Sequence, residues 1–434
     1  MRTLYAHRGV VIAFLVTYTL ATSVVLLLQA RVLVVAPTTA PPSVVSKFLC
    51  VGETFQEDAW KYRSCHLQSV CYDGNAAGVF TFHVDPGRPG RSAPAPGQLA
   101  VSASPLGCTH PAVRWEPVVV HAPVEDDVDW AEDIPHVLAV EYNGSNFGHV
   151  LGDSVLPWWR LLDMFGFGHD EFQPVHMEVD PLFKYSCAWQ VREKWIRDAS
   201  ICDELYRKVA VPFAKRGLLS LQQHYNRTGR RRRVCFRNLF AGIGMLSDHG
   251  HDHTVHGRYA EHADLHMVGG GPMVWGFRDE YMRRLGLDSN AQPLPGANDV
   301  VFVARTSQHR AWYDAERAQA YLENEFRDRG VQVRRPLEFN TLPMKLQVEL
   351  VSTARVLVTF PGGSSYIAMF LPRGSTLIFV FSHESDGRQD YPLWGNLAHV
   401  NVVWIEGNYS SSSREVVFDH AQLSRAVETA LLYQ

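Results

Sequence analysis

The sequence predicts an α/β fold with a parallel sheet between helices, and two observations in the C-terminal third carry that prediction. Apolar runs rich in Val, Ile, Leu and Phe, too short to span a membrane, alternate with segments of helical spacing. The apolar runs lie at 299–304, 356–360 and 376–381, and the helical segments at 314–327, 343–352 and 364–371. Strands that alternate with helices are typical of βαβ units, so we expect parallel strands with helices on both faces.

Length and composition limit the class of protein. A chain of 434 residues is long enough for about two or three domains. Its 46% apolar and 20% charged residues are typical of a globular protein and exclude a disordered one. The formal net charge of −4 gives no overall basic field, so we expect no nucleic-acid partner.

The N-terminus predicts a membrane anchor. Residues 10–28 form an uncharged, mainly apolar run close to the length that a bilayer-spanning helix needs. Arg2 and Arg8 precede this run, and Arg31 follows it. Because the more basic flank tends to stay in the cytoplasm, we expect a cytoplasmic N-terminus with the rest of the chain across the membrane. A cleaved signal peptide is the alternative. The Pro/Thr/Ser-rich residues that follow predict a stem, since such a composition does not pack into a core.

Sequons and cysteines fit the lumen of the secretory pathway. The N-x-S/T sequons are at Asn143, Asn226 and Asn408. Cysteines in that compartment tend to form disulfides, and seven of them leave at least one thiol free or bonded to another chain. The sequence does not determine which cysteines pair. We expect 50–107 to be irregular, and short strands at 117–121 and 137–142.

A segment at 146–165 carries the first candidate chemistry. Its apolar residues follow a helical spacing, Asn146 is placed to cap the helix, and Pro157 is expected to kink or restart it. His149 and Asp153 are four residues apart and therefore share one face of a helix. Such a pair is either an acid/base couple acting on a hydroxyl or a local hydrogen bond that stiffens the helix. Glycines beside the pair let a substrate or another backbone approach: Gly148 and Gly152.

A histidine cluster suggests a different chemistry. Several imidazoles close together can bind zinc, and a hydrolytic zinc site needs three or four such ligands. The cluster comprises His249, His251, His253, His256, His262 and His266. It is either a metal site or a set of surface histidines.

The carboxyl ends of the predicted strands offer a second candidate site. Ligands of parallel α/β sheets bind beyond these ends. Arg305 follows the first strand, and Gly362, Gly363, Ser364 and Ser365 follow the third. A glycine turn before a helix directs backbone N–H groups at an anion, and arginine can hold a diphosphate through paired hydrogen bonds.

Three separated motifs resemble glycosyltransferase family 61, in the same order. The first is N-x-x-H-x-x-x-D, here Asn146, His149 and Asp153. The second is a strand followed by Arg and Ser-x-x-Arg, here VFVARTSQHR with Arg305, Ser307 and Arg310. The third is the helix–strand–turn element that contains Gln347, Gly362, Phe370, Pro372, Arg373 and Gly374. Together the motifs span about residues 146–381.

The resemblance implies a GT-B fold, in which two Rossmann-like domains face each other across a cleft. It implies an inverting hexosyl- or pentosyltransferase that moves a sugar from a nucleotide sugar, commonly a UDP-sugar, to a hydroxyl of a glycan or glycoprotein. His149 and Asp153 would be the catalytic pair. The donor would be bound by Arg305, Ser307, Arg310, Gln347, Gly362, Gly363, Ser364 and Ser365. No cofactor is required, and a divalent metal is not expected.

The full expected organisation is that of a single-pass type II protein of the Golgi or endoplasmic-reticulum membrane, with its catalytic part in the lumen. The predicted parts are a cytoplasmic tail at 1–9, a transmembrane signal anchor at 10–28, a stem at 29–49, an N-terminal acceptor-side domain at 50–292 and a C-terminal nucleotide-sugar-binding domain at 293–434.

The chain departs from the family pattern at three positions. Pro361 and Ile367 replace the His and Asn of the usual H-G-A-x-x-x-N turn, and Phe379 replaces a carboxylate suited to ribose hydroxyls. These departures are consistent with a divergent donor, a shifted binding mode or a catalytically inactive relative that binds a glycan or nucleotide. A separate alternative to the transferase is a zinc hydrolase centred on the histidine cluster His249–His266.

Overall fold

A computed structural model gives the fold of most of the chain beyond the predicted stem. It describes residues 45–52, 59–74, 79–85, 93–103, 113–140, 143–177, 186–214, 216–221, 233–244, 270–293, 296, 299–303, 312–335, 339–382, 397 and 399–432. Several predicted features lie outside these residues: the anchor at 10–28, Asn226, the cluster His249–His266, Arg305, Ser307 and Arg310. No helix within the described ranges is long and apolar enough to cross a membrane.

The C-terminal half contains the predicted parallel sheet. Its strands lie in the order β16-β14-β17-β18-β19, and every neighbouring pair is parallel. Numbered along the chain, this order is 2-1-3-4-5, which is that of a doubly wound sheet. The strands are β14 (Val300–Val303), β16 (Val333–Arg334), β17 (Val356–Thr359), β18 (Thr376–Phe381) and β19 (Asn401–Glu406).

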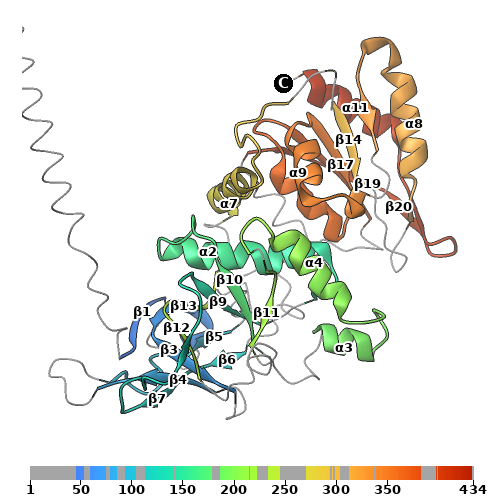
Figure 1. The fold of residues 1–434 in the computed structure, drawn as a ribbon. Helices are drawn as coiled ribbons and strands as arrows, with labels where there is room; N and C mark the ends of the chain where they lie inside the picture. Colours follow the sequence, from blue (N-terminus) through green and yellow to red (C-terminus); the bar gives the residue numbers. More distant parts are fainter. Residues whose placement is uncertain are drawn as a thin grey trace, which may run out of the picture. The chain divides into compact units, whose positions relative to one another are not determined.

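Helices cover both faces of this sheet (Figure 1), as the alternation of strands and helices predicts. Because successive side chains of a strand point to opposite faces, Val300 and Phe302 pack with one set of helices and Val301 and Val303 with the other. The first set is α8 (Ala315–Glu325) and α11 (His420–Leu432). The second set is α9 (Met344–Ser352) and the 3₁₀ helix η7 (Gly363–Phe370).

Short elements complete the C-terminal half. A small three-stranded sheet has the order β15-β21-β20, with bounds β15 (Trp312–Tyr313), β20 (Asn408–Ser410) and β21 (Glu415–Val417). Two 3₁₀ turns are η5 (Arg327–Arg329) and η6 (Phe339–Thr341).

The N-terminal half is built on two mixed sheets and is not a second parallel Rossmann-like sheet. A six-stranded sheet has the order β1-β2-β13-β9-β10-β11, in which β1 and β2 are antiparallel to their neighbours and the others are parallel. Its strands are β1 (Lys47–Gly52), β2 (Arg63–Gln68), β9 (His136–Ala139), β10 (Gln173–His176), β11 (Leu219–Ser220) and β13 (Leu239–Gly242). The 3₁₀ helix η1 (Ala59–Tyr62) joins β1 to β2.

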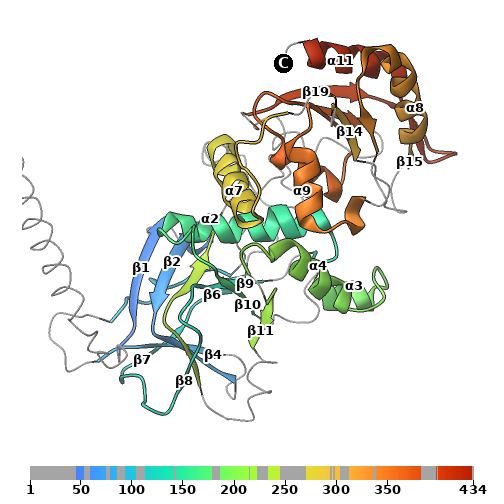
Figure 2. The same cartoon turned by 45° about the horizontal axis from the view of Figure 1, so that its top comes forward.

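A second sheet packs against the first around an apolar core (Figure 2). Its order is β7-β4-β3-β12-β8, with bounds β3 (Val70–Asp73), β4 (Val79–His83), β7 (Val118–Val120), β8 (Asp129–Trp130) and β12 (Val234–Phe236). The pair β5 (Val101–Ser102) and β6 (Arg114–Trp115) lies beside them. Residues 50–107 thus contribute strands to both sheets, and the expectation that they are irregular was wrong. Their pairing partners, such as β12 and β13, lie far along the chain, so local sequence does not show the pairing.

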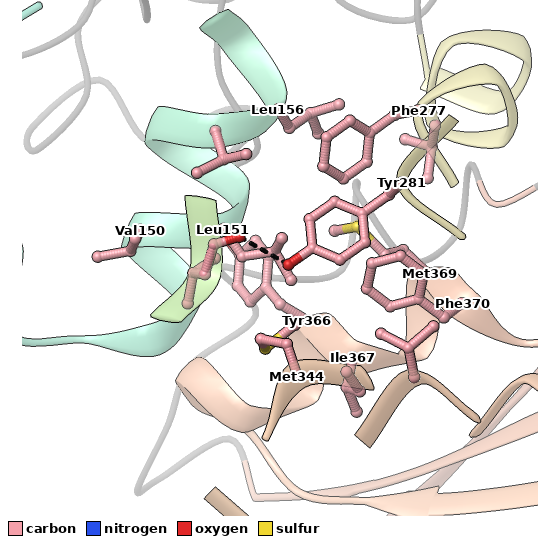
Figure 3. Close-up of a cluster of buried hydrophobic side chains, with 14 of the residues drawn as sticks. Val150, Leu151, Leu156, Phe277, Tyr281, Met344, Tyr366, Ile367, Met369 and Phe370 are labelled. Carbon is pink, nitrogen blue, oxygen red and sulfur yellow. Dashed lines mark hydrogen bonds between the residues drawn. The ribbon is translucent and has the colours of Figure 1, made fainter. Parts of the chain in front are cut away.

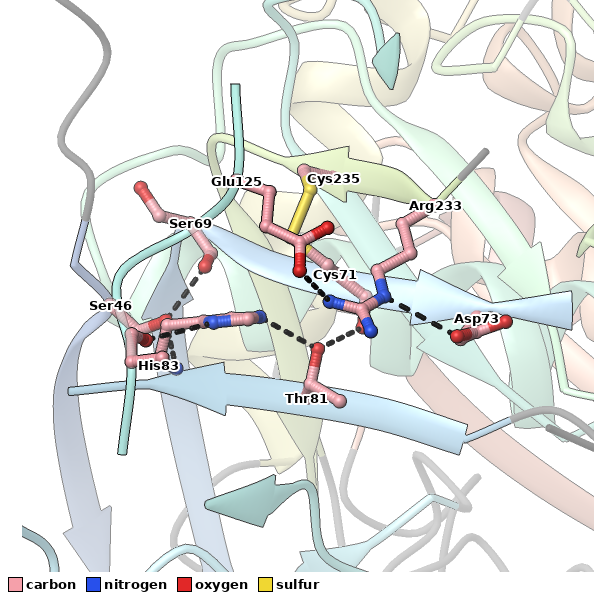
Figure 4. Close-up of a disulfide and its surroundings, with 10 residues drawn as sticks. Ser46, Ser69, Cys71, Asp73, Thr81, His83, Glu125, Arg233 and Cys235 are labelled. Atoms are coloured by element: carbon pink, nitrogen blue, oxygen red, sulfur yellow. Dashed lines mark hydrogen bonds and ion pairs between the residues drawn. A yellow bond between two sulfur atoms is a disulfide. The ribbon is translucent and has the colours of Figure 1, made fainter. Parts of the chain in front are cut away.

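Each sheet contains a disulfide between two of its neighbouring strands. Cys50–Cys65 joins β1 to β2, and Cys71–Cys235 joins β3 to β12 across 164 residues of sequence (Figure 4). The third bond, Cys187–Cys202, links α3 (Cys187–Arg192) to α4 (Ser200–Ala210). Beside the second disulfide, Arg233 contacts the carboxylates of Asp73 and Glu125. Disulfides of this kind are typical of proteins in oxidising compartments.

One apolar core runs through both halves of the described region. It contains side chains of the helix α2 (Leu156–Met164), α4 and α7 (Gly270–Arg284) together with side chains of α9, η7, β17 and β18. At its centre Phe277 and Tyr281 of α7 pack against Phe370 of η7, and the Tyr281 hydroxyl donates to the Val209 carbonyl at 2.6 Å. The two halves therefore meet through packed side chains at this place.

A buried histidine lies where α7 meets the start of β19. His399 packs edge-to-face on Trp275, and its side chain is almost wholly buried. The Trp275 ring also contacts the guanidinium groups of Arg278 and Arg373. Burial, followed by the nearby charges of Arg278 and Arg373, lowers the pKa of His399 to about 4, although a hydrogen bond with the Met369 backbone acts to raise it.

This histidine predicts a pH dependence of stability. An unfolded chain binds the histidine proton near pH 6.5, whereas folded His399 binds it near pH 4. The stabilisation from neutral His399 is therefore complete above about pH 6.5 and is lost as the pH falls toward 4. Both the wild type and His399→Leu are compared at pH 7 and at pH 4.5. The fall in unfolding free energy between these two pH values should be larger by about 2–3 kcal/mol in the wild type than in the variant. Urea unfolding at both pH values measures this, and identical losses would refute it.

Candidate functional site

The helix after β9 begins at Phe147 and has the cap that the sequence predicts. The Asn146 side-chain oxygen accepts a hydrogen bond from the Gly148 N–H at 2.9 Å, and the Asn146 carbonyl accepts from the Val150 N–H at 3.0 Å. Asn146 therefore satisfies N–H groups that the first turn of a helix leaves without an intrahelical partner.

The next residues form a π-helix, η3 (His149–Val155), which continues into α2. The Leu156 N–H donates to the Leu151 carbonyl, five residues back. Pro157 follows directly and explains this geometry, because its ring would clash with the carbonyl four residues earlier in a regular α-helix. The chain stays helical through Pro157 by widening one turn. Such π segments occur frequently at functional sites.

His149 and Asp153 form the predicted pair. The His149 Nδ1 is hydrogen-bonded to the Asp153 carboxylate. The Asp153 side chain is fully buried, whereas the His149 side chain is 18% exposed. An incoming hydroxyl can therefore reach His149 but not Asp153. A carboxylate on Nδ1 favours the tautomer with the proton on that nitrogen, so Nε2 is the nitrogen suited to accept a proton.

The turn after β17 has the backbone that the glycines predict. Gly362 has φ 133° and ψ 179°, a conformation that residues with a Cβ rarely adopt. It lies at the carboxyl end of β17, whose neighbour on one side is β14. The strand order reverses between these two strands, and ligands of doubly wound sheets bind at that switch point. The turn is thus where a donor site is expected in this half.

The two motifs touch each other. A Cβ on Gly363 would lie 2.1 Å from the Asn146 side-chain oxygen, and a Cβ on Gly152 would lie 2.1 Å from the Tyr366 ring. A Cβ on Gly148 would meet both Gly363 and Tyr366 at 2.7 Å. Figure 3 shows the Tyr366 ring packed against this helix, beside Val150 and Leu151. The sequence predicted that a substrate or another backbone would approach Gly148 and Gly152. In the structure, the space beside these two glycines is filled by the glycine turn and by Tyr366.

The other predicted donor residues divide into accessible and buried ones. Gly362 and Gly363 are partly exposed, so their backbone can be reached by a ligand. Ser365 is fully buried and its hydroxyl donates to the Gly362 carbonyl at 2.8 Å, so it holds the turn in shape. Gln347 is also fully buried, and its amide donates to the Leu342 carbonyl. Ser364 is 9% exposed.

The three departures from the family pattern lie inside the protein. Pro361 is buried at the turn. Ile367 and Phe379 belong to the apolar core that joins the two halves, and Phe379 packs edge-to-face on Trp404 of the adjacent strand. Apolar residues at these positions therefore add to the core instead of presenting polar groups to a ligand.

Two of the three sequons lie in the described part of the chain. Asn143 is half-buried, with φ 47°, just before the helix that carries His149. Asn408 is exposed at the start of β20. Asn408 is therefore the more accessible acceptor for a glycan.

Sequence reasoning missed Tyr366, which is the residue that joins the two motifs. Its only sequence signal is the spacing of Gly148 and Gly152, which leaves a groove along one side of a helix. That spacing shows that something approaches, but it does not identify a side chain more than 200 residues away in sequence. Among the described residues, the helix that carries His149 meets the Gly362–Gly363 turn both through Tyr366 and through the contact of Gly363 with Asn146 and Gly148.

Comparisons with known proteins give weak likenesses. No protein-family model matches the sequence, and no curated protein matches it. Among solved structures, the chain is similar to a glycosyl transferase of family 9 from Veillonella parvula, with 14% identity over 71% of this chain and 99% of that one and a TM-score of 0.33. The chain is also similar to the E. coli heptosyltransferase WaaC, with 12% identity and a TM-score of 0.29. This likeness covers 68% of this chain and 99% of WaaC.

A third likeness, to the iron-containing glycosyltransferase TibC from enterotoxigenic E. coli, has 12% identity over 60% of this chain and 61% of that one, with a TM-score of 0.25. Likenesses at these TM-scores assign neither a fold nor an activity. The resemblance to glycosyltransferase family 61 therefore stays a prediction, and the fold rests on the strand order and helix packing described above.

The contact between the motifs yields a stability prediction. Gly152→Ala places a Cβ inside the Tyr366 ring position, so it should lower the unfolding free energy by about 1–3 kcal/mol or more. In the Tyr366→Ala background the same substitution should cost much less, because the ring is gone. A denaturant double-mutant cycle measures the coupling. Additive effects of the two substitutions would show that the ring does not occupy this groove.

Proposed function

We propose that the protein is an inverting glycosyltransferase that moves a sugar from a nucleotide sugar to a hydroxyl of a glycan or glycoprotein. The observation that carries the proposal is the direct packing of the His149–Asp153 helix on the Gly362–Gly363 turn. A proton acceptor oriented by a buried carboxylate lies beside a glycine turn at the switch point of a doubly wound sheet. General-base catalysis and binding of a nucleotide diphosphate need these two parts next to each other.

The arrangement assigns different roles to the two members of the pair. His149 takes the proton from the acceptor hydroxyl as its oxygen forms a bond to the anomeric carbon of the donor. The bond from that carbon to the diphosphate oxygen breaks, and the electron pair leaves with the diphosphate. This single displacement inverts the anomeric configuration. Asp153 touches neither substrate, because its side chain is fully buried, and it acts as a positioning residue for His149.

The donor side is proposed from the turn and from the sequence. Backbone N–H groups at the partly exposed Gly362–Gly363 turn would bind the departing diphosphate, which carries the developing negative charge. From the sequence resemblance we assign the cationic contacts to Arg305, Ser307 and Arg310. A UDP-sugar is the first donor to test, and transfer is expected to persist in EDTA.

The remaining parts of the proposal concern location. The apolar run at 10–28 would anchor the protein in the Golgi or endoplasmic-reticulum membrane with the catalytic part in the lumen. The three disulfides support this placement, since such bonds persist in oxidising compartments.

A catalytically inactive relative is the second candidate, and burial of the side chains around the turn favours it. Ser365 is enclosed, Ile367 and Phe379 are in the core, and Gln347 donates to a backbone carbonyl. These residues leave fewer polar side chains for a donor than the family pattern has. Such a protein would bind UDP or a glycan without turnover. The zinc-hydrolase alternative draws no support from the described residues, which contain no group of three metal-ligating side chains.

Substitution of the histidine tests the proposed base. His149→Gln should lower the rate of sugar transfer by about 10²–10⁴-fold, because no group remains to accept the proton, while UDP affinity stays unchanged. Asp153→Asn should lower transfer as well by losing the orientation of His149. The measurements are transfer of radiolabelled sugar from a panel of UDP-sugars and calorimetric titration with UDP.

A matched control is His169→Gln, which changes a histidine with an 85% exposed side chain on the same half of the protein. It should leave transfer and UDP affinity unaltered. Transfer that survives in His149→Gln would remove this residue from the mechanism. UDP binding by the wild type without transfer to any acceptor would favour the inactive relative.

A further inference from the structure

A hollow of about 680 Å³ lies in the N-terminal half, and the elements that carry His149 and Gly362 are not among those that line it. Its walls are β1, η1 and the turn at 95–98. The side chains that matter for its chemistry are Phe48, Leu49, Trp60, Arg63, Gln98 and Arg114. A hollow of this volume is within the range of small-ligand sites in proteins.

The lining residue Arg63 lies near the end of the six-stranded sheet from which the His149 helix follows. Ala139 ends β9, and the helix follows from that end of the strand. In the register of the sheet, Ala139 of β9 lies in one row with Gly242 of β13, Ser64 of β2 and Val51 of β1. Arg63, which lines the hollow, is the neighbour of Ser64 in the chain. Three strand spacings separate β9 from β1, or about 14 Å.

The segment between the hollow and the helix is closely packed. A Cβ on Gly242 would lie 2.3 Å from the Arg63 carbonyl oxygen, and a Cβ on Gly244 would lie 1.7 Å from the Pro157 carbonyl oxygen. The chain at 242–244 therefore contacts both the start of β2 and the start of α2. The position of the hollow relative to the His149 helix is fixed by this packing.

The lining combines apolar surface with positive charge. Leu49 is 58% exposed and lies near Trp60, whose ring has the Lys61 ammonium group 5.6 Å from its centre. Arg63 and Arg114 line the hollow, and none of the described residues that line it is acidic. The Arg114 guanidinium is more than half exposed and contacts only one carboxylate, that of Glu116, at 3.3 Å among the ion pairs of the described chain. Such a lining suits a ligand with an apolar face and a negative charge.

The walls are rigid before any ligand arrives. The buried Arg63 donates through Nη1 to the carbonyl groups of Gly97, Gln98 and Ala100, at 2.7, 3.0 and 3.2 Å. The turn is held further by the Gly97 N–H, which donates to Glu116. On the opposite wall the Cys50–Cys65 disulfide fixes β1 to β2. A preformed site loses less entropy on binding than a site that must order itself.

We propose that this hollow binds an acidic sugar of the acceptor glycan, one that carries a carboxylate or a sulfate group. The apolar face of the sugar ring would lie on Trp60 and Leu49, and its acidic group would bind Arg114. The identity of the ligand as a glycan rests on the proposed transferase function. The hollow and its charge are independent of that function, and an acidic peptide is the competing ligand.

Direct binding to the full-length protein tests this inference. The probes are an oligosaccharide containing uronic acid, a sulfated oligosaccharide, a neutral oligosaccharide of the same length and an acidic peptide, each followed by calorimetric titration. The first two, or one of them, should bind in a salt-sensitive manner, and the neutral one should bind much more weakly. Trp60→Ala and Arg114→Ala should each weaken the acidic glycan by about tenfold or more.

Arg216→Ala is the matched control for Arg114→Ala. Arg216 is an exposed arginine paired with Glu132, and it does not line the hollow. Its loss should leave glycan affinity unchanged, and His149→Gln should also bind the acidic glycan normally. Because Arg114 is exposed, its substitution leaves the fold intact even where Trp60→Ala does not.

The results separate this inference from the proposed function. Binding that depends on Trp60 and Arg114 in a protein with no transferase activity would support the hollow and refute the transferase. Transfer with an acceptor KM that is unaltered in Arg114→Ala would refute the hollow and leave the transferase standing. Equal binding of the neutral oligosaccharide, preference for the acidic peptide, or no binding of any probe would each overturn the inference.

Discussion

The packing of Tyr366 and Gly363 against the side of the His149 helix is the contact on which the candidate site depends. Two glycines of that helix leave room for the tyrosine ring and the glycine turn, with no space for even one added methyl group. Because proteins accommodate overlaps of this size poorly, the helix and the turn keep a fixed position relative to each other. The proposed base and the proposed donor turn therefore belong to one rigid arrangement.

This contact also explains the composition of the chain around it. The 3₁₀ helix η7 is buried along almost its whole length because it lies between the sheet and the helices of the other half. Apolar Ile367 and Phe379 fit that environment, where an unpaired polar side chain would be costly. Among the described residues of the two motifs, the partly exposed groups suited to chemistry are Gly362, Gly363 and His149.

Local patterns predicted the C-terminal half and the motif helix well. Alternating strands and helices gave the parallel sheet, Asn146 was found as the cap, and the π turn appears where Pro157 was expected to disturb the helix. The N-terminal sheets were largely missed because their pairing joins distant segments, as Cys71 and Cys235 show. Spacing on a helix placed His149 beside Asp153, but only the fold shows that the carboxylate is buried and the imidazole is accessible. The part played by Tyr366 required the fold for the same reason.

The central claim is that the glycine turn binds a nucleotide diphosphate next to His149. A crystal structure of the protein with UDP bound tests it most directly. The account predicts the diphosphate within hydrogen-bonding distance of the backbone N–H groups at Gly362–Gly363, at the carboxyl ends of β14 and β17 and on the side of the turn that faces His149. UDP bound elsewhere on the protein, with this turn unoccupied, would contradict it.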